Sequence, residues 1–200
     1  MRVDLPVSRT ADYEPISVNI TSSSGFGLRR VFYTVPSNLI GHRLGGRLYD
    51  DRIELFLSGT HLLTLPRGRA GSTGPNVHVV NYRHVIHSLK KKPMALMNLV
   101  YRDALFPREP YRRCFEKALE QLSGRQACRL AVTLLALAHE ANCEAELAHA
   151  IDKALNDGRL PDPDKLKARF ARDPGSMPSV RIAKPLLAGY GTLLDAGGAA

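Results

Sequence analysis

The first third of the chain alternates hydrophobic and polar residues with a period of two, which is the pattern of half-buried β-strands. The alternation is clearest in 15–21, where Ile16, Val18 and Ile20 are separated by polar residues. Further strands are predicted in 28–36, 42–51, 52–57 and 61–66, with a hairpin turn at Ser58-Gly59. Because these strands are short and no helical pattern separates them, the sequence predicts a small antiparallel β-barrel or curled sheet.

After residue 80 the hydrophobic residues recur at helical spacing instead. The first predicted helix has Val85, Ile86 and Leu89 on its inward side and ends at Lys92, since a residue before a proline avoids the α conformation. The apolar side chains expected from the next helix are Met94, Leu96, Met97, Val100 and Tyr101. Further helical patterns cover 111–122, one long stretch that ends at Gly158, and 162–170.

The two patterns together predict an α+β protein, with a small antiparallel β-barrel followed by an all-α region. The segment between them is rich in Gly, Ser and Pro, which is typical of a linker. The predicted division is a linker in 1–14, the barrel in 15–66, a basic linker in 67–80, helices in 81–172 and a loosely ordered tail in 173–200.

Composition places the chain among ordinary globular proteins, with 44% hydrophobic and 24% charged residues. No N-terminal stretch has the form of a signal peptide, and the most apolar stretch, 129–143, is interrupted by a histidine and a glutamate. Cys114, Cys128 and Cys143 are an odd number in helical patterns, so we expect buried free thiols in a reducing compartment. These features predict a cytoplasmic protein with no membrane partner.

The positive charge is concentrated in one segment. The formal net charge is +9, and residues 81–113 contain eight basic and two acidic side chains, whereas 114–200 contains equal numbers of both. Such a local excess is typical of a surface that binds a polyanion, and a solvated helix face gives the same pattern. The candidate DNA-binding residues are Arg67, Arg69, Arg83, Lys90, Lys91, Lys92, Arg102, Arg108, Arg112 and Arg113. Beside Arg83, Tyr82 and His84 are candidates for stacking or sugar contacts. The alternative interpretation of Tyr82 is that it packs into the helical core.

A metal site finds little support in the residues. A two-helix ligand set can be drawn from His84, His87, His139, Cys143 and His149, but no CxxC or HExxH motif accompanies it. The glycines of RLGGRL are not followed by the Lys-Ser/Thr pair of a phosphate-binding loop. We therefore predict no metal and no cofactor.

A catalytic acidic triad can be drawn from Asp50 or Asp51, Asp103 and Glu140, because two-metal phosphoryl-transfer enzymes hold their ions with carboxylates. The context argues against it. Asp103 falls at a helix end and Glu140 in the middle of a helix, with no sheet on which they could converge. Roles at a turn and on the surface are the simpler interpretation.

Three longer segments resemble a known family. These are GFGLRRVFYTVPSNLIGHRLGGRLYDDRIELFL, THLLTLPRGRA and NYRHVIHSLKKKPMALMNLVYRDALFPREPYRR. They are similar to the C-terminal region of IstA-type transposases, from the twenty-one family of bacterial insertion sequences, which resemble the phage Mu transposase. The resemblance runs from about Leu5 to about Leu194, and its most specific stretches are RHVIHSL, KPMAL, LVYRD and LFPR.

The resemblance implies a β-barrel followed by helices, preceded in such transposases by a catalytic core with Asp, Asp and Glu. The first matching segment of this sequence corresponds to the barrel of the family. We therefore expect a truncated or split transposase that lacks the catalytic carboxylates and is not an enzyme. The implied partners are transposon-end or target DNA, full-length transposase subunits and an AAA+ helper ATPase, in a bacterial cytoplasm at the nucleoid. The alternative is a protein–protein docking module for the transposase or the ATPase, without direct DNA binding.

Overall fold

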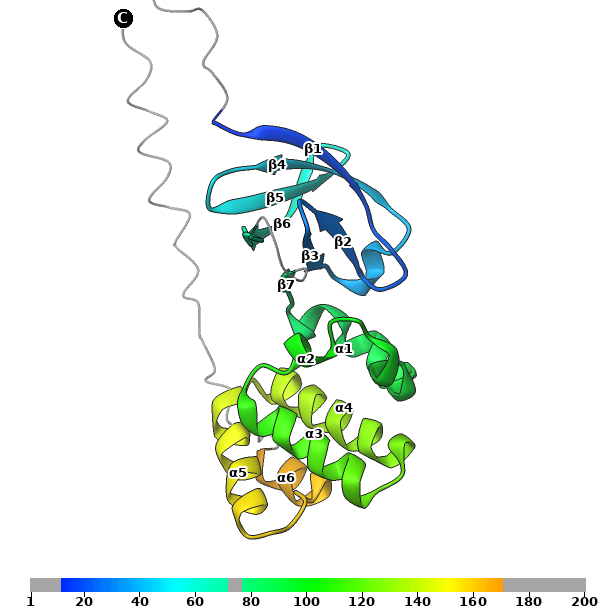
Figure 1. Cartoon of the computed structure of the whole chain (residues 1–200), viewed down its shortest axis with the longest axis vertical. Coiled ribbons are helices and arrows are strands. Elements are labelled where there is room, and N and C mark those ends of the chain that lie inside the picture. The colour runs from blue at the N-terminus through cyan, green and yellow to red at the C-terminus, as the bar shows by residue number, and fades with distance from the viewer. Residues whose placement is uncertain (1–11, 72–76, 171–200) are drawn as a thin grey trace, which may run out of the picture.

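The protein consists of a β-part followed by a helical part. The structure is a computed structural model that describes residues 12–71 and 77–170, and Figure 1 shows the strands at one end and the longer helices at the other. The strands are β1 (Glu14–Asn19), β2 (Gly25–Leu28), β3 (Val31–Thr34), β4 (Arg43–Leu48), β5 (Arg52–Leu57), β6 (Thr60–Pro66) and β7 (Val77–Val79). The helices are α1 (Tyr82–Lys91), α2 (Arg102–Leu105), α3 (Glu109–Gln121), α4 (Gly124–Ala141), α5 (Glu144–Asn156) and α6 (Pro163–Phe170), with the 3₁₀ helices η1 (Ser37–Leu39) and η2 (Pro93–Asn98). Most of the predicted N-terminal linker and the predicted tail 173–200 lie outside the described residues.

The strands form two sheets. The larger is antiparallel in the order β1-β4-β5-β6, and the smaller has the order β2-β3-β7, in which β3 and β7 are parallel. The alternation predicted for 15–21 is confirmed, because Val18 and Ile20 are buried while Ser17 and Asn19 are exposed. β4 alternates in the same way, with Leu44 and Leu48 buried. The buried side chains of both sheets form one hydrophobic core.

The described sheets do not close into a barrel. Pairing in the larger sheet begins at β1 and ends at β6, and these two edge strands are not paired with each other. An antiparallel sheet followed by helices is therefore confirmed, whereas a closed barrel is not.

One predicted strand is a hairpin. The sequence predicts a single strand over 28–36, but β2 and β3 pair antiparallel around Arg29 and Arg30, whose φ angles are 48° and 63°. Two consecutive positive φ angles make the tight turn that matches the twist of a hairpin, and such turns favour Asn and Gly. A pair of arginines therefore gives no turn signal. The turn at Ser58-Gly59 lies where it was predicted, with φ angles of 49° and 84°.

The segment predicted to be a linker packs against the smaller sheet. The amide of Gly68 donates a hydrogen bond to the hydroxyl of Tyr33 at 3.0 Å, and β7 pairs with β3. A Cβ atom on Gly68 would lie 2.7 Å from Val31 Cγ1 and 2.8 Å from Val79 Cγ2, so this close approach needs glycine. Residues of the 67–80 segment thus belong to the β-part.

The helical part is built around α4, which contacts α1, η2, α3, α5 and α6. A capping box starts α4, because the Ser123 side chain accepts from the Gln126 amide and the Gln126 side chain accepts from the Ser123 amide. Cys114, Cys128 and Cys143 are buried and form no disulfide, as predicted. None of the helices within 12–71 and 77–170 combines the length and the hydrophobicity needed to cross a bilayer.

The long helix predicted to end at Gly158 is two helices. Asn142 has a left-handed φ of 51° and ends α4, and α5 begins at Glu144. Asparagine is one of the few residues besides glycine that adopt this conformation readily. The hydrophobic spacing continues across the break, so spacing alone could not reveal it.

The helix predicted to follow α1 is also different. Leu96 and Tyr101 are buried as expected, but Met94 is 44% exposed and Val100 is 87% exposed. The reason is that residues 93–98 form the 3₁₀ helix η2, which repeats every three residues and ends before Val100. This segment therefore presents apolar side chains at the surface.

The two parts meet at what we call the strand–helix junction. Thr34 is fully buried there; its hydroxyl accepts a hydrogen bond from the amide that precedes α1 at 2.9 Å and lies 3.2 Å from Nδ1 of His84. The hydroxyl of Tyr101 donates to the carbonyl of Ser23 at 2.7 Å, and its ring stacks on Phe32 with centroids 5.2 Å apart. Hydrogen bonds and ring packing thus fix the first helices against the sheet.

Candidate nucleic-acid interface

The ten basic residues predicted from the sequence do not form one continuous surface. Eight of them lie within ion-pair distance of a carboxylate. The pairs are Arg67 and Arg69 with Asp50, Arg83 and Arg108 with Glu144, Lys90 with Glu140, Arg102 with Asp103, Arg112 with Glu109 and Glu116, and Arg113 with Asp152. Surface pairs of this kind add little stability, but each carboxylate offsets the charge that a phosphate would meet.

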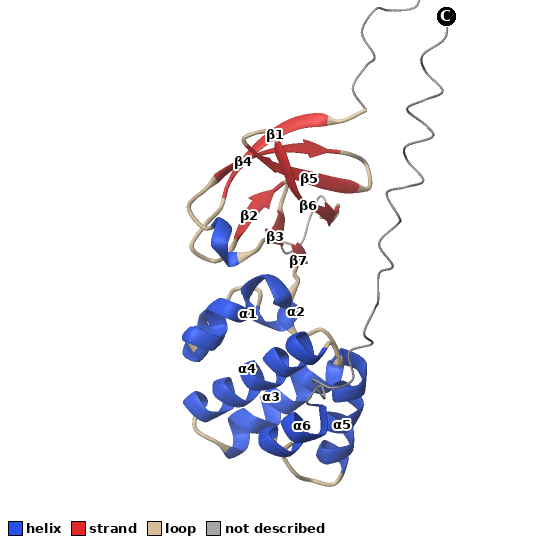
Figure 2. Cartoon of the chain, turned by 180° about the vertical axis from the view of Figure 1, so that it is seen from behind, coloured by secondary structure: helices blue, strands red, loops and turns tan. Residues whose placement is uncertain are grey.

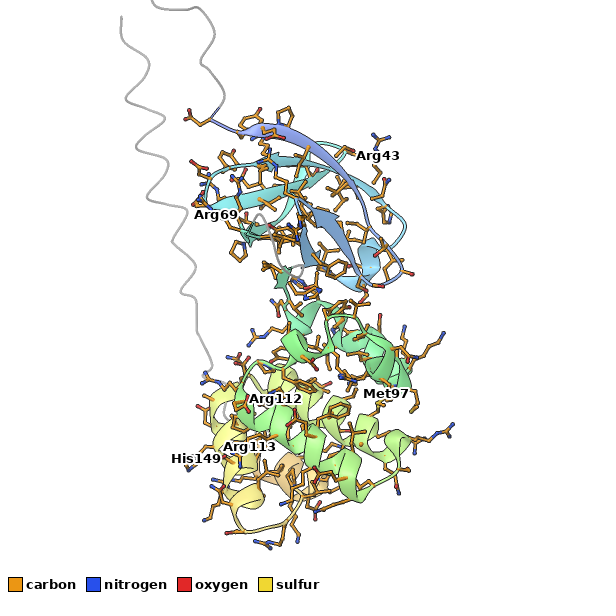
Figure 3. The ribbon with its side chains drawn as sticks, in the orientation of Figure 1. Arg43, Arg69, Met97, Arg112, Arg113 and His149 are labelled. Carbon is orange, nitrogen blue, oxygen red and sulfur yellow. The ribbon has the colours of Figure 1, made fainter. Side chains whose placement is uncertain are left out.

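Several of these residues have structural roles instead. The side chain of Arg67 is only 19% exposed, and its guanidinium donates to the carbonyl of Tyr49 at 2.8 Å, so it connects the chain after β6 to the β4–β5 turn. Figure 3 shows Arg112 and Arg113 on α3, near α5 and away from Met97 of η2. The predicted set is therefore spread over both parts of the molecule.

Glu144 is the shared acceptor for two arginines and a tyrosine. It lies 3.7 Å from the guanidinium of Arg83, 3.5 Å from that of Arg108 and 3.2 Å from the hydroxyl of Tyr82. Tyr82 is buried, and this burial raises its pKa. The interpretation of Tyr82 as a core residue is thus confirmed, and its ring is not available to stack on a nucleotide.

Lys91 and Lys92 are the two predicted residues without an ion-pair partner among the described residues. Both are exposed at the C-terminal end of α1. Lys92 shares a cleft of about 430 Å³ with Arg125 and Arg129 of α4. Lys91 lines an adjacent cleft together with Lys92. We call Lys91, Lys92, Arg125 and Arg129 the basic surface.

Arg125 and Arg129 complete this surface from another helix. They are four residues apart, so they lie on one side of α4, and both are exposed without an ion-pair partner in the described part of the chain. Arg125 is in the first turn of α4, where the helix dipole adds positive potential. Sequence reasoning missed both because the segment 114–200 has no net charge. Their i, i+4 spacing was the available signal.

A second cleft beside the basic surface is less favourable for an anion. It has a volume of about 250 Å³, and its charged lining residues are Lys90, Arg129, Glu140 and Lys167. Glu140 is paired with Lys90. Of these two clefts, only the one lined by Lys92, Arg125 and Arg129 has no carboxylate in its lining.

His84 lies at the junction instead of on the basic surface. Its ring is partly buried against Thr34, and this burial lowers its pKa below the ordinary 6.5, while a hydrogen bond with Thr34 acts in the opposite direction. The folded protein therefore binds the His84 proton more weakly than the unfolded chain does.

The lowered pKa of His84 predicts a pH-dependent stability. Between the lowered folded pKa and 6.5 the unfolded chain binds more protons, so the free energy of unfolding falls as the pH is lowered through this window. A His84→Asn variant, whose side-chain oxygen replaces Nδ1, is expected to lose part of this slope. Urea unfolding at several pH values from about 7.5 to 5 measures it. Equal slopes for the variant and the wild type would contradict the assignment.

The residues from which a metal site was drawn are only partly brought together. The rings of His87 and His139 lie 5.6 Å apart across α1 and α4, and burial, followed by the neighbouring His87, lowers the pKa of His139. Cys143 is buried with its thiol near the carbonyl of Leu137, whereas His149 is exposed on α5 (Figure 3). Within the described ranges no three His, Cys, Asp or Glu side chains are grouped so that they could hold a metal ion.

The carboxylates of the acidic triad are not brought together either. Asp50 and Asp51 lie at the β4–β5 turn, Asp103 lies on α2, and Glu140 lies on α4. Each is within ion-pair distance of a basic residue. The turn and surface roles inferred from the sequence agree with these positions.

The fold and the surface define an α/β protein with an antiparallel sheet, a helical part and a basic surface at the helical end. The chain is 56% identical over 190 residues to an uncharacterized protein of Sinorhizobium fredii, y4jA/y4nE/y4sE, and the match covers 95% of this chain and 38% of the relative. The chain thus spans well under half the length of this curated relative. No family model matches the sequence, and no solved structure matches it.

Proposed function

We propose that this chain is a DNA-binding and assembly part of an insertion-sequence transposase, and that it contributes no catalytic residues of its own. The observation that carries the proposal is the basic surface, whose four cations have no carboxylate partner among the described residues. The resemblance of 81–113 to the C-terminal region of IstA-type transposases supplies the kind of polyanion. In this proposal the two sheets correspond to the barrel of that family.

The chemistry of the basic surface fits phosphate groups and not base edges. Flexible lysines and arginines at a helix end contact the backbone of a duplex and release its bound counterions. Four such contacts correspond to a slope of about −3.6 in a plot of log affinity against log salt concentration. Contacts to phosphates position a protein on DNA without reading its sequence, so we expect modest sequence preference.

A fluorescence-anisotropy titration tests the proposal. The chain is titrated against a transposon-end duplex and a scrambled duplex at salt concentrations from about 50 to 200 mM. We expect both duplexes to bind with a steep salt dependence, and any preference for the end sequence adds specificity. Absence of binding at the lowest salt concentration would overturn the DNA-binding proposal. Nuclease and strand-transfer assays with magnesium or manganese are expected to show no activity.

A second candidate function is a docking module for transposase subunits or the AAA+ helper ATPase. The exposed apolar side chains Met94 and Val100 favour it, because each leaves apolar surface that a protein partner would cover. In the cytoplasmic assembly that we propose, docking and DNA contact take place on the same chain. A pull-down with transposase and ATPase, repeated with Val100→Asp, distinguishes docking from DNA binding because this change leaves the basic surface intact.

A further inference from the structure

The outer face of the larger sheet carries aromatic rings and guanidinium groups in one row. Along β4 and β5 the side chains of Leu44, Leu48, Ile53 and Leu55 point into the core. The alternate positions, among them Arg47 and Phe56, lie on the outward side, as alternation along a strand requires. Apart from the 3₁₀ helix η1, which lies near β2, the described helices form the other part of the molecule, and none of them covers this face (Figures 1 and 2).

The row is continuous across the sheet. The ring of His61 on β6 meets the ring of Phe56 on β5 edge to face, with centroids 5.4 Å apart. The guanidinium of Arg47 on β4 lies 4.7 Å from the centroid of Phe56 and 4.9 Å from that of Tyr13. The row thus passes from an edge strand over two central strands to the segment that precedes β1.

The row continues at the β4–β5 turn. The ring of Tyr13 lies 5.6 Å from that of Tyr49, and the guanidinium of Arg52 lies 4.0 Å from the centroid of Tyr49. We call Tyr13, Arg47, Tyr49, Arg52, Phe56 and His61 the ring face. A solvated side of an antiparallel sheet is usually polar, so six planar groups in contact with each other on such a side are unusual.

The ring face is open to a ligand. Gly45 is the cross-strand partner of Phe56, and a Cβ atom added to Gly45 would meet no other atom within 4 Å. On the Gly45 side of the Phe56 ring no β4 side chain fills the space, while Arg47 of β4 lies against the ring at 4.7 Å from its centroid. Arg47 and His61 are exposed, and Phe56 is partly exposed.

The charge of this face is positive on balance, because three arginines accompany two carboxylates. Arg43, Arg47 and Arg52 project from β4 and β5, and Asp51 and Glu54 both pair with Arg52. Glu54 accepts hydrogen bonds from Arg52 at 2.9 Å and from the hydroxyl of Tyr49 at 3.2 Å, so it holds two members of the ring face in place. Arg43 and Arg47 remain to meet a negatively charged ligand.

We propose that the ring face binds single-stranded nucleic acid, with unpaired bases stacked on its rings and guanidinium planes and phosphates near Arg43 and Arg47. Stacking on aromatic and arginine planes is how many proteins hold unpaired bases, and it tolerates any sequence because every base has a π face. A duplex keeps its bases stacked on each other, so it cannot use this face in the same way. The ring face shares no residue with the basic surface, and the proposal does not rest on duplex binding.

A charge-neutral double variant tests this proposal. Phe56→Leu removes the aromatic ring and keeps a hydrophobic side chain. Arg47→Lys removes the planar guanidinium group and keeps the positive charge. We expect the variant to bind a short fluorescent oligo-dT about ten- to a hundredfold more weakly than the wild type, because each stacked base contributes strongly to such affinities. Its affinity for a duplex is expected to be unchanged. Phe56→Tyr, which keeps the ring, is expected to bind oligo-dT like the wild type.

The controls separate this proposal from the proposed function. Thermal unfolding of each variant verifies that the sheet is intact, and glutamine substitution of Lys91 and Lys92 is expected to weaken duplex binding but not binding of the short oligo-dT. If the wild type does not bind oligo-dT at low salt, or if the double variant binds it as well as the wild type does, the ring face is not a single-strand site. Binding of a protein partner by this face without oligonucleotide binding would also overturn the proposal. Failure of duplex binding alone would contradict the proposed function and not the single-strand site on the ring face.

Discussion

Replacing Lys91, Lys92, Arg125 and Arg129 with glutamine is expected to weaken duplex binding by a factor on the order of 10³ at about 0.1 M salt. Each phosphate contact contributes about −0.9 to the slope of log affinity against log salt, so the loss of four contacts makes the slope less negative by about 3.6. The side chains are exposed and have no ion-pair partner among the described residues, so the fold should tolerate their removal. Anisotropy titrations at several salt concentrations measure both the affinity and the slope.

A second fourfold variant serves as the matched control. Arg83, Arg108, Arg112 and Arg113 belong to the same basic segment, and changing all four to glutamine removes the same total charge. Because each of them has a carboxylate partner, we expect this variant to lose affinity only a few-fold. Equal losses in the two variants would mean that net charge, and not the basic surface, determines binding.

Tyr101→Ala is expected to lower the free energy of unfolding by about 3–5 kcal/mol, the usual cost of truncating a large buried aromatic side chain. Tyr101 is only 2% exposed, its ring stacks on Phe32 of β3, and its hydroxyl donates to the Ser23 carbonyl. Burial raises the pKa of Tyr101 to about 12, so the hydroxyl keeps its proton and remains a donor at neutral pH. One truncation therefore removes a ring contact and a hydrogen bond across the strand–helix junction.

Two further variants separate the contributions at this position. Tyr101→Phe keeps the ring and is expected to cost about 0.5–1.5 kcal/mol, the usual range for one lost hydrogen bond. Val100→Ala changes the preceding residue, which is 87% exposed, and is expected to alter stability by less than about 0.5 kcal/mol. Urea unfolding followed by circular dichroism measures all three. A Tyr101→Ala variant as stable as Val100→Ala would show that the junction does not fix the two parts together.

The two proposed surfaces assign different forms of DNA to the helical part and the β-part. The basic surface lies at the helical end and suits the phosphates of a duplex, whereas the ring face lies on the sheet and suits unpaired bases. A transposase part with both surfaces would hold a duplex and a separated strand at the same time. The oligo-dT and duplex titrations test the two surfaces independently.

The sequence by itself determined the features that depend on residues close together along the chain. The stripe of Val85, Ile86 and Leu89 predicted α1, and the Ser58-Gly59 pair predicted the turn before β6. Each of these signals lies within one turn or one strand, where periodicity and local backbone preference decide the conformation. The separation of a β-part from a helical part followed from the same signals.

The tertiary structure decided which charges are available and which surfaces form. The ion pairs of Lys90 with Glu140 and of Arg113 with Asp152 form only when the helices have packed together. The same packing brings Lys92 and Arg129 to one cleft. The parallel pairing of β7 with β3 and the row from His61 to Tyr13 likewise join residues that are distant along the chain. The free energy of such contacts depends on side-chain positions that packing sets, so the spacing of residues in the sequence carries no signal for them.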